Sequence, residues 1–532
     1  MRFMNPKPYI MLARCLMAYP FFLSAARQPN IIYILADDMG YGDVAANNPN
    51  CKFPTPFLDQ LAEEGMRFTD AHTNSSVCTP TRYGILTGRY SWRTHLKGGV
   101  LDGAAGPLIA SDRTTVATFL KKQGYSTACV GKWHLGMSWP TKDGKKPLGS
   151  RGDNIDFTQP IANGPNDVGF DYFYGISASL NMPPHAYIEN RMIDADDLVF
   201  AGDSKDIKAL GLVRAKEGWV SKSFKQDRVL RTFAEKSVAW IKKQKKGKPF
   251  FLYIPLNSPH SPIVPQAKFK DKSGINPHAD FCMETDWAVG EVMKAVDEMG
   301  FSKNTLFVFT ADNGTSPAAK YEVLQAAGQY PSHIYRGLKG SLWEGGHRVP
   351  FIVRWPKAVK AGSVNDQLIC VTDLLATVAD ITEVDLAPDE GEDSVSFLAS
   401  LRYGEENDCV RGGVVHHSDS GIFSIRKGKW KLILDRRGGT RRENPKDRAY
   451  RPTASIQLYD MDEDSVESTN LEEEYPEVVI QLKKLLADFV NRGRSTAGEA
   501  QKNDPFDKDW KELLPVREYL NEAFQSQVDK KQ

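Results

Sequence analysis

Ile31-Ile32-Tyr33-Ile34-Leu35 is an apolar run that stands just before the acidic pair Asp37-Asp38. A run without polar alternation is typical of a sheet strand that is covered on both faces. Four further runs of this kind lie at 126–130, 250–254, 305–309 and 351–355, and helical patterns such as 56–64 and 281–299 lie between them. This alternation predicts an α/β fold in which helices flank a layered sheet.

Polar side chains follow four of these runs directly. They are Asp37 and Asp38 after the first, Lys132 and His134 after the second, His260 after the third, and Asp312 and Asn313 after the fourth. In such sheets the active groups gather beyond the carboxyl ends of the strands, so we expect one site on one rim. The stretch 139–225 is rich in Gly, Pro and Asp and predicts loops over that rim, where substrate choice would lie.

The two oxygen-rich pairs, Asp37-Asp38 and Asp312-Asn313, are of the type that calcium and magnesium prefer. Asp, Asn and Gly also dominate turns, so either pair by itself could be a turn. Found together with the cysteine motif described below, the pairs favour a divalent cation site. No Cys-x-x-Cys pair suggests zinc.

The length of 532 residues exceeds the size at which a single core stops growing, so we expect a large domain and a smaller one. Lys and Arg total 68 against 67 for Asp and Glu, which gives a net charge of +1. This balance gives no reason to expect a nucleic-acid partner, and attraction to an anionic substrate must be local.

Residues 1–26 place basic residues before a mostly apolar stretch that ends in Ser24-Ala25-Ala26. The pattern predicts a signal peptide and a secreted or periplasmic protein, although Arg14 interrupts it and leaves a cytoplasmic start as the alternative. No other segment approaches the length of a membrane span. Of seven cysteines, the five outside the signal peptide and the motif at Cys78 allow at most one or two disulfides.

The texture changes near residue 405. Residues 421–426 and 429–434 predict a hairpin, 457–460 a further strand, and 476–491 an amphipathic helix. We therefore expect a domain at 27–405, a smaller domain at 406–495 with an antiparallel sheet and a helix, and a peripheral charged tail at 496–532.

The run Cys78-Thr79-Pro80-Thr81-Arg82-Tyr83-Gly84-Ile85-Leu86-Thr87-Gly88-Arg89 resembles the maturation signature of the type I sulfatases, with Thr81 where Ser is usual. An isolated cysteine would more often be a small buried hydrophobe. Three more stretches resemble motifs of the same family in the same order: 131–136, 257–262 and 337–346. The resemblance extends from Asn30 to about Asn491 and fits the arylsulfatase A-like branch.

The resemblance implies an alkaline phosphatase-like layered fold, with a large mixed central sheet flanked by helices and a small C-terminal antiparallel sheet with a helix. It implies that Cys78 is oxidised to formylglycine by a formylglycine-generating enzyme. It further implies one bound Ca²⁺, or Mg²⁺, per chain. The implied metal-binding residues are Asp37, Asp38, Cys78, Asp312 and Asn313, and the implied catalytic residues are Cys78, Arg82, Lys132, His134, His260 and Lys339.

A formylglycine hydrates to a geminal diol, in which one hydroxyl attacks sulfur and deprotonation of the other later expels sulfate. In the family pattern Arg82 steadies the diol, Lys132 contacts sulfate and His134 takes the proton. His260 and Lys339 flank the bridging oxygen, and His260 protonates the departing alkoxide. A histidine suits such work because its pKa lies near neutrality.

The sequence thus predicts a secreted hydrolase that cleaves sulfate monoesters of sugars or aryl alcohols by S–O fission. One alternative is a formylglycine-dependent phosphodiesterase or phosphonate monoester hydrolase, and another is a noncatalytic binder of sulfated glycans. Weaker candidates for contact with the sugar are Arg93, His95, His185, His333, His347 and Arg348, each of which could equally be structural. His416 and His417 are expected to be structural.

Overall fold

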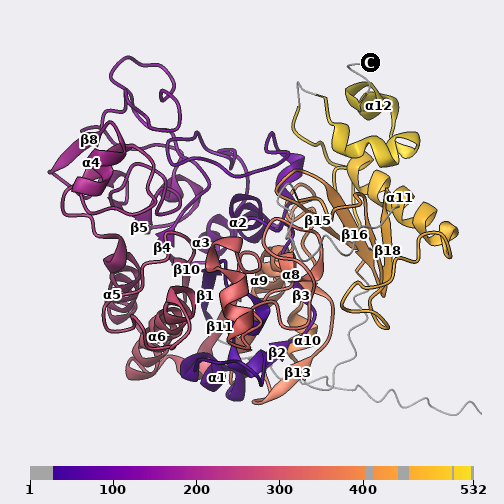
Figure 1. Ribbon diagram of the computed structural model, residues 1–532, viewed down its shortest axis with the longest axis horizontal. Coiled ribbons are helices and arrows are strands. Elements are labelled where there is room, and N and C mark those ends of the chain that lie inside the picture. Colours follow the sequence, from indigo (N-terminus) through magenta and orange to yellow (C-terminus); the bar gives the residue numbers. More distant parts are fainter. Residues whose placement is uncertain (1–27, 403–410, 441–454, 506–508, 529–532) are drawn as a thin grey trace, which may run out of the picture.

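The computed structural model describes residues 28–402, 411–440, 455–505 and 509–528 (Figure 1). The predicted signal peptide and Cys409 lie outside these ranges. A ten-stranded sheet runs through the larger domain in the order β13-β2-β12-β11-β1-β10-β4-β5-β6-β7. Its strands are β1 (Asn30–Asp37), β2 (Met66–Phe68), β4 (Ser126–Lys132), β5 (Tyr172–Ile176), β6 (Ile188–Glu189), β7 (Met192–Ile193), β10 (Phe250–Pro259), β11 (Thr305–Ala311), β12 (Phe351–Arg354) and β13 (Ser363–Asn365).

The centre of the sheet is parallel, because β1 pairs in parallel with both β10 and β11, and β10 with β4. Every residue of β1, β10 and β11 is buried, which explains their unbroken apolar sequences. β12 runs antiparallel to β11, so the sheet is mixed, as the resemblance implied. All five predicted strands are confirmed.

Helices cover both faces of this sheet. α1 (Pro56–Glu63), α5 (Val229–Lys242) and α6 (Pro277–Glu298) lie on one side, and α2 (Cys78–Thr87), α3 (Val116–Lys122) and α9 (Leu374–Thr382) on the other (Figure 1). α6 begins before the predicted 281 because Asn276 caps it, with its side chain accepting a hydrogen bond from the Ala279 N–H at 3.1 Å. Its first turn lacks the apolar periodicity on which the prediction depended.

The stretch 139–225 differs from the expected loops, since it contributes β5, β6 and β7 to one edge of the central sheet. It also holds α4 (Ser204–Ala209) and a separate pair, β8 (Leu198–Ala201) with β9 (Gly218–Ser221). The remaining short elements of the larger domain are β3 (Ala71–His72), α7 (Tyr321–Ala326), α8 (Glu344–His347), β14 (Ile369–Cys370) and α10 (Leu398–Leu401).

The smaller C-terminal sheet is antiparallel, with strands β15 (Val414–His417), β16 (Phe423–Lys427), β17 (Trp430–Ile433) and β18 (Gln457–Asp460), and α11 (Pro476–Asn491) packs on it. The hairpin, β18 and α11 are confirmed, whereas β15 was not predicted. Residues expected to be a peripheral tail instead pack onto this domain. Trp510, Leu513 and Val516 are buried in its core, and a 3₁₀ helix (Lys511–Tyr519) and α12 (Glu522–Val528) follow there.

Two further observations concern the whole chain. Cys51, Cys129, Cys282 and Cys370 are free thiols, so no disulfide forms among the described residues. Within the same residues, no helix combines the length and the apolar character needed to cross a membrane.

Candidate functional site

The carboxyl ends of β1, β4, β10 and β11 meet at one rim of the sheet and bring the predicted polar residues together. Asp37 is the last residue of β1 and Lys132 the last of β4. The Lys132 Nζ lies 2.6 Å from the Asp37 Oδ2, and both side chains are buried. The Cys78 Sγ lies 3.6 Å from the other Asp37 oxygen. The expectation of a single rim is confirmed in its geometry.

Cys78 opens helix α2, and every residue of that helix is buried. Val77 before it is extended, so the free N–H groups of the first turn lie at the cysteine. α2 ends at Gly88, whose φ of 62° suits a glycine, and an added Cβ there would come within 2.9 Å of the Ser394 Cβ. The helix is therefore fixed at both ends, with its N-terminus directed into the site.

Arg82 lies one helical turn after Cys78 and is fully buried. Its Nε and Nη2 donate to the Asp312 Oδ2 at 3.0 and 2.7 Å. Its Nη1 donates to the Lys132 carbonyl at 2.9 Å. A buried guanidinium needs such partners, and they hold Arg82 in one orientation beside the cysteine.

Lys339 and His260 approach from the opposite side of Asp38. The Lys339 Nζ donates to the Asp38 Oδ1 and lies 3.2 Å from the Cys78 Sγ. The His260 Nε2 lies 3.7 Å from the Asp38 Oδ2. Lys339 and His260 are each 15% exposed in their side chains, whereas Asp38 is buried, so solvent reaches the site from the side of these two residues.

The oxygen-rich residues have the properties of a cation site. The Asp38 N–H donates to the Asp312 Oδ1 at 3.2 Å, and the Asn313 Nδ2 donates to the Asp38 Oδ1 at 2.8 Å. The Asp38 Oδ2 and the Asn313 Oδ1 are buried without a hydrogen-bond partner among the described residues. Buried oxygens without partners are costly, and hard oxygens of this kind are calcium and magnesium ligands. Ligand atoms of Asp37, Asp38, Cys78 and His260 also lie within 4.8 Å of one another, so the residues fit a divalent cation.

The electrostatics of the site favour anions. Burial by itself would raise the pKa of Cys78, but the charges of Lys132 and Lys339 lower that pKa to about 7. Burial also acts to raise the pKa of Asp37, and Lys132, His260 and Arg82 together hold it well below its usual range. The cysteine thus stands in a field that stabilises negative charge on its side chain and on a ligand beside it.

His134 stands close behind the site with one nitrogen fixed. Its Nε2 lies 2.8 Å from the Leu101 carbonyl, which requires the proton on Nε2 and leaves Nδ1 as an acceptor. That Nδ1 is buried without a hydrogen-bond partner in the described part of the chain. Burial and the charges of Lys132 and Arg82 hold the pKa of His134 well below its usual value, so the ring is neutral. The Leu101 carbonyl has no sequence signal, because every residue carries one.

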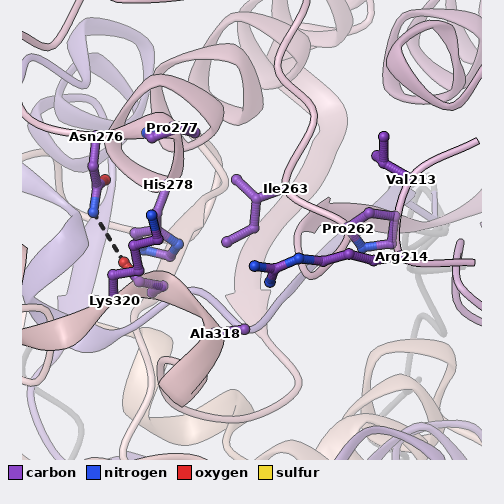
Figure 2. A pocket seen from close by; sticks show the side chains of 10 residues that line it. Val213, Arg214, Pro262, Ile263, Asn276, Pro277, His278, Ala318 and Lys320 are labelled. Carbon is purple, nitrogen blue, oxygen red and sulfur yellow. Dashed lines mark hydrogen bonds between the residues drawn. The ribbon is translucent and has the colours of Figure 1, made fainter.

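A pocket of about 180 Å³ opens beside the loop that follows His260 (Figure 2). Pro262 and Ile263 form one wall, and Arg214, His278 and Lys320 line others. Sequence reasoning missed these three basic residues, since no motif surrounds them.

The weaker candidates lie mostly elsewhere. Arg93 is buried in an ion pair with Asp393, the His185 Nε2 contacts the Lys216 carbonyl, and His95 is exposed on another segment. His333 lines a separate surface pocket. None of these residues contacts the catalytic rim.

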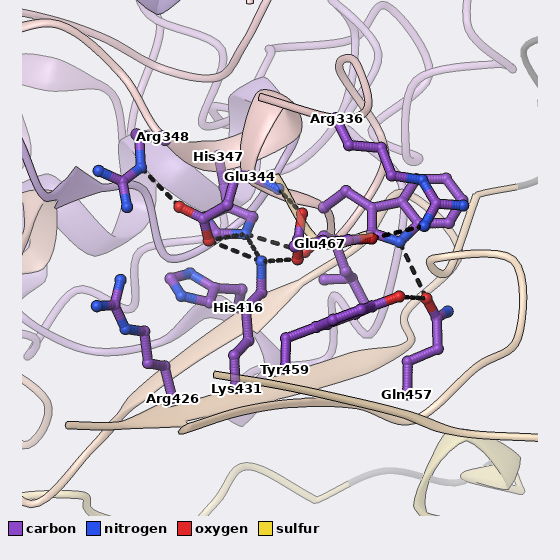
Figure 3. Close-up of polar contacts among 12 residues, drawn as sticks. Arg336, Glu344, His347, Arg348, His416, Arg426, Lys431, Gln457, Tyr459 and Glu467 are labelled. Carbon is purple, nitrogen blue, oxygen red and sulfur yellow. Dashed lines mark hydrogen bonds and ion pairs between the residues drawn. The ribbon is translucent and has the colours of Figure 1, made fainter. Parts of the chain in front are cut away.

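His347 and Arg348 belong to a buried ion network between the two domains (Figure 3). The Lys431 Nζ lies 2.8 Å from Glu344 and 2.7 Å from Glu467. The Arg348 Nε lies 2.6 Å from Glu344. These residues hold β17 against α8 and are not available to a sugar, so the prediction for His347 and Arg348 was wrong. His416 stacks on His347 with ring centroids 3.9 Å apart, which agrees with its expected structural role.

Comparisons with known proteins agree with this geometry. A family model described as Sulfatase matches residues 29–384. The chain is 32% identical to an N-acetylgalactosamine-6-O-sulfatase of Bacteroides thetaiotaomicron, over 88% of this chain and 94% of that protein. It is 32% identical to arylsulfatase A of Bos taurus, over 88% of this chain and 89% of the relative. A solved 6S-sulfatase structure from a study of glycosaminoglycan metabolism by Bacteroides thetaiotaomicron superposes with a TM-score of 0.75 at 31% identity, covering 87% of this chain and 99% of the other.

Proposed function

Because this chain belongs to the sulfatase family, in its arylsulfatase A-like branch with the alkaline phosphatase-like fold, it is a sulfuric ester hydrolase, and we propose that its nucleophile is a formylglycine formed from Cys78. The observation that carries the proposal is the place of Cys78. It stands at the N-terminus of α2, with the Lys339 Nζ at 3.2 Å and Asp37 at 3.6 Å. A thiol with only a packing role would not need a buried lysine and a buried aspartate beside it.

Two groups complete the proposed site. A formylglycine at position 78 supplies a hydrated aldehyde, with one hydroxyl for attack on sulfur and a second for the release of sulfate. A divalent cation, Ca²⁺ or Mg²⁺, supplies Lewis-acid stabilisation of the charge on the sulfuryl group. The residues that would hold the cation are Asp37, Asp38, Asp312, Asn313 and the modified Cys78, as the partnerless buried oxygens of Asp38 and Asn313 support.

The remaining side chains would bind sulfate and move protons. Lys132 and Lys339 present ammonium groups to the sulfate oxygens, and Arg82 stabilises the diol from the first turn of α2. His134 accepts a proton at its Nδ1, the nitrogen left free by the Leu101 contact. His260 delivers a proton from its Nε2 to the departing oxygen, which matters most when that oxygen belongs to a sugar alcohol.

The proposed substrate is a sulfated sugar. The supporting observation is the likeness to a relative named for N-acetylgalactosamine-6-O-sulfatase activity, which spans almost the whole of both chains. The proposed location is outside the cytoplasm, where sulfated polysaccharides occur, and the proposed maturation partner is a formylglycine-generating enzyme. Both rest on the sequence pattern and the family.

The test is peptide mass spectrometry across residues 68–82, on protein made in its native host or together with a maturation enzyme. Formylglycine at position 78 is expected, together with hydrolysis of 4-nitrophenyl sulfate. Cys78→Ala is expected to fold normally and to lose all turnover, because no other side chain can replace the diol. An unmodified cysteine in active protein, or full activity in the variant, would refute the proposed nucleophile.

A further inference from the structure

The pocket beside His260, here called the Arg214 pocket, is lined by basic and apolar residues only. Arg214, Lys320 and His278 line it together with Pro262 and Ile263, and none of its lining residues is acidic. Figure 2 shows the Arg214 side chain reaching toward Ile263 and Ala318, with Lys320 on the opposite side of the pocket. Its volume of about 180 Å³ is smaller than the roughly 300 Å³ of a site for a drug-sized ligand, so it suits one sugar unit.

The pocket adjoins the catalytic rim through the same loops that carry the site. Pro262 and Ile263 continue the segment of His260, and Ala318 to Lys320 continue the segment of Asp312 and Asn313. A chain of contacts also links the two places. The His278 Nε2 lies 3.1 Å from Asp43, Asp43 accepts from the Thr315 hydroxyl at 3.2 Å, and the Thr315 carbonyl accepts from the Lys339 N–H at 3.0 Å.

The charge of the pocket is not balanced by the protein. Among the described residues neither Arg214 nor Lys320 has an ion-pair partner, whereas Arg191 on the same long insertion pairs with Asp167 at 2.6 Å. His278 is only 2% exposed, and its Nδ1 has no hydrogen-bond partner within the described residues. The pocket also lies at the N-terminus of the 22-residue helix α6, whose dipole adds positive potential. Two exposed cations and a helix N-terminus around one apolar-floored hollow are stabilised when an anion enters it.

We propose that the Arg214 pocket is a second anion-binding subsite, which takes a carboxylate or sulfate group on the sugar next to the one that is desulfated. This inference rests on the proposed function, since it assigns the neighbouring unit of the same substrate. Arg214 and Lys320 bind the anionic group from opposite walls, and Pro262 and Ile263 contact the apolar face of the ring. The protein therefore prefers chains in which charged units adjoin the reacting one.

The test compares kcat/KM for Arg214→Met, Lys320→Met and the double variant on four substrates. Three are sulfated oligosaccharides whose neighbouring unit carries a carboxylate, a second sulfate or no charge, and the fourth is 4-nitrophenyl sulfate. The matched control is Lys245→Met, an exposed lysine in the turn before β10, at the opposite end of that strand. On a charged neighbour the double variant should lose roughly 10- to 100-fold in kcat/KM, the equivalent of one or two hydrogen bonds to charged groups, mainly through KM.

On the uncharged neighbour and on 4-nitrophenyl sulfate all variants should stay within about twofold of the parent protein, because the pocket adds no transition-state contact there. Whichever charged substrate shows the loss identifies the anionic group. An equal loss on all four substrates, or no loss on either charged one, would overturn the subsite.

A binding arm separates this outcome from failure of the proposed function. Calorimetric titration of Cys78→Ala protein with the same oligosaccharides should show weaker binding of the charged ones when Arg214 and Lys320 are replaced. If the parent protein hydrolysed none of the four substrates, the proposed function would fail, and the titration would still decide the subsite. Binding that is equal with and without the two cations would refute it.

Discussion

Replacing Arg93 by methionine is expected to destabilise the protein strongly while leaving the catalytic rim unchanged. The Arg93 guanidinium is fully buried and forms a two-pronged contact with Asp393, Nε to Oδ2 at 2.8 Å and Nη2 to Oδ1 at 2.7 Å. Its Nη1 donates to the Phe489 carbonyl at 2.9 Å, at the end of α11. Arg93 therefore ties the segment after α2 to the C-terminal domain.

The expected magnitude follows from what the substitution leaves behind. Removing one partner of a buried ion pair costs about 3–5 kcal/mol, because the other charge stays buried and uncompensated. Asp393 would keep hydrogen bonds from the Tyr90 and Ser495 N–H groups at 2.8 and 3.1 Å, which favours the lower end of that range. Loss of the donor to Phe489 adds about 1 kcal/mol, so we expect a total of about 4 kcal/mol.

The assay is urea unfolding followed by tryptophan fluorescence, with 4-nitrophenyl sulfate hydrolysis measured at low temperature on the folded protein. Arg93→Met should unfold at a much lower urea concentration and keep kcat within about twofold, because it touches no reacting group. The double variant Arg93→Met/Asp393→Asn should recover part of the loss, since no charge remains buried alone. Unchanged stability together with a large loss of kcat/KM would place Arg93 in the substrate pocket and refute this reasoning.

Three further predictions concern the site and the second domain. His260→Ala should lower kcat/KM on sugar sulfates by roughly 10²- to 10⁴-fold and much less on 4-nitrophenyl sulfate, whose phenol leaves without protonation; an equal loss on both removes the leaving-group role. Chelation of divalent cations should lower both the activity and the thermal midpoint, and Ca²⁺ should restore both in the parent protein but not in Asp38→Asn. If chelated protein keeps its midpoint and activity, the cation assignment is wrong. Burial, assisted by the charge of Lys97, lowers the pKa of His417 to about 4. The unfolded chain, with a pKa near 6.5, binds more protons in between, so the free energy of unfolding should fall by about 3 kcal/mol as the pH drops from about 6.5 to 4; His417→Phe should flatten that part of the curve, and an unaltered pH profile would contradict the account.

Much of the fold could be predicted because its signals are local. The run before Asp37 is apolar without alternation because β1 is buried on both faces, and α11 begins and ends where its amphipathic pattern does. β15 was missed because His416 and His417 interrupt its apolar character, although both side chains are buried. The tail was misjudged for the same kind of reason. Its charged residues outnumber the few large apolar ones, such as Trp510, that anchor it to the second domain.

The sequence by itself determined the family, the strands that end at the rim and the residues that could react, because motif spacing and apolar runs depend on near neighbours. Only the tertiary structure decided which charged residues serve the site. Arg82 meets Asp312 across 230 positions, and Lys339 meets Cys78 across 261. Arg93 and His347 have the same chemical groups as catalytic residues but meet Asp393 and Lys431 instead. The role of a charged side chain depends on the partner beside it, and in this protein those partners come from distant parts of the chain.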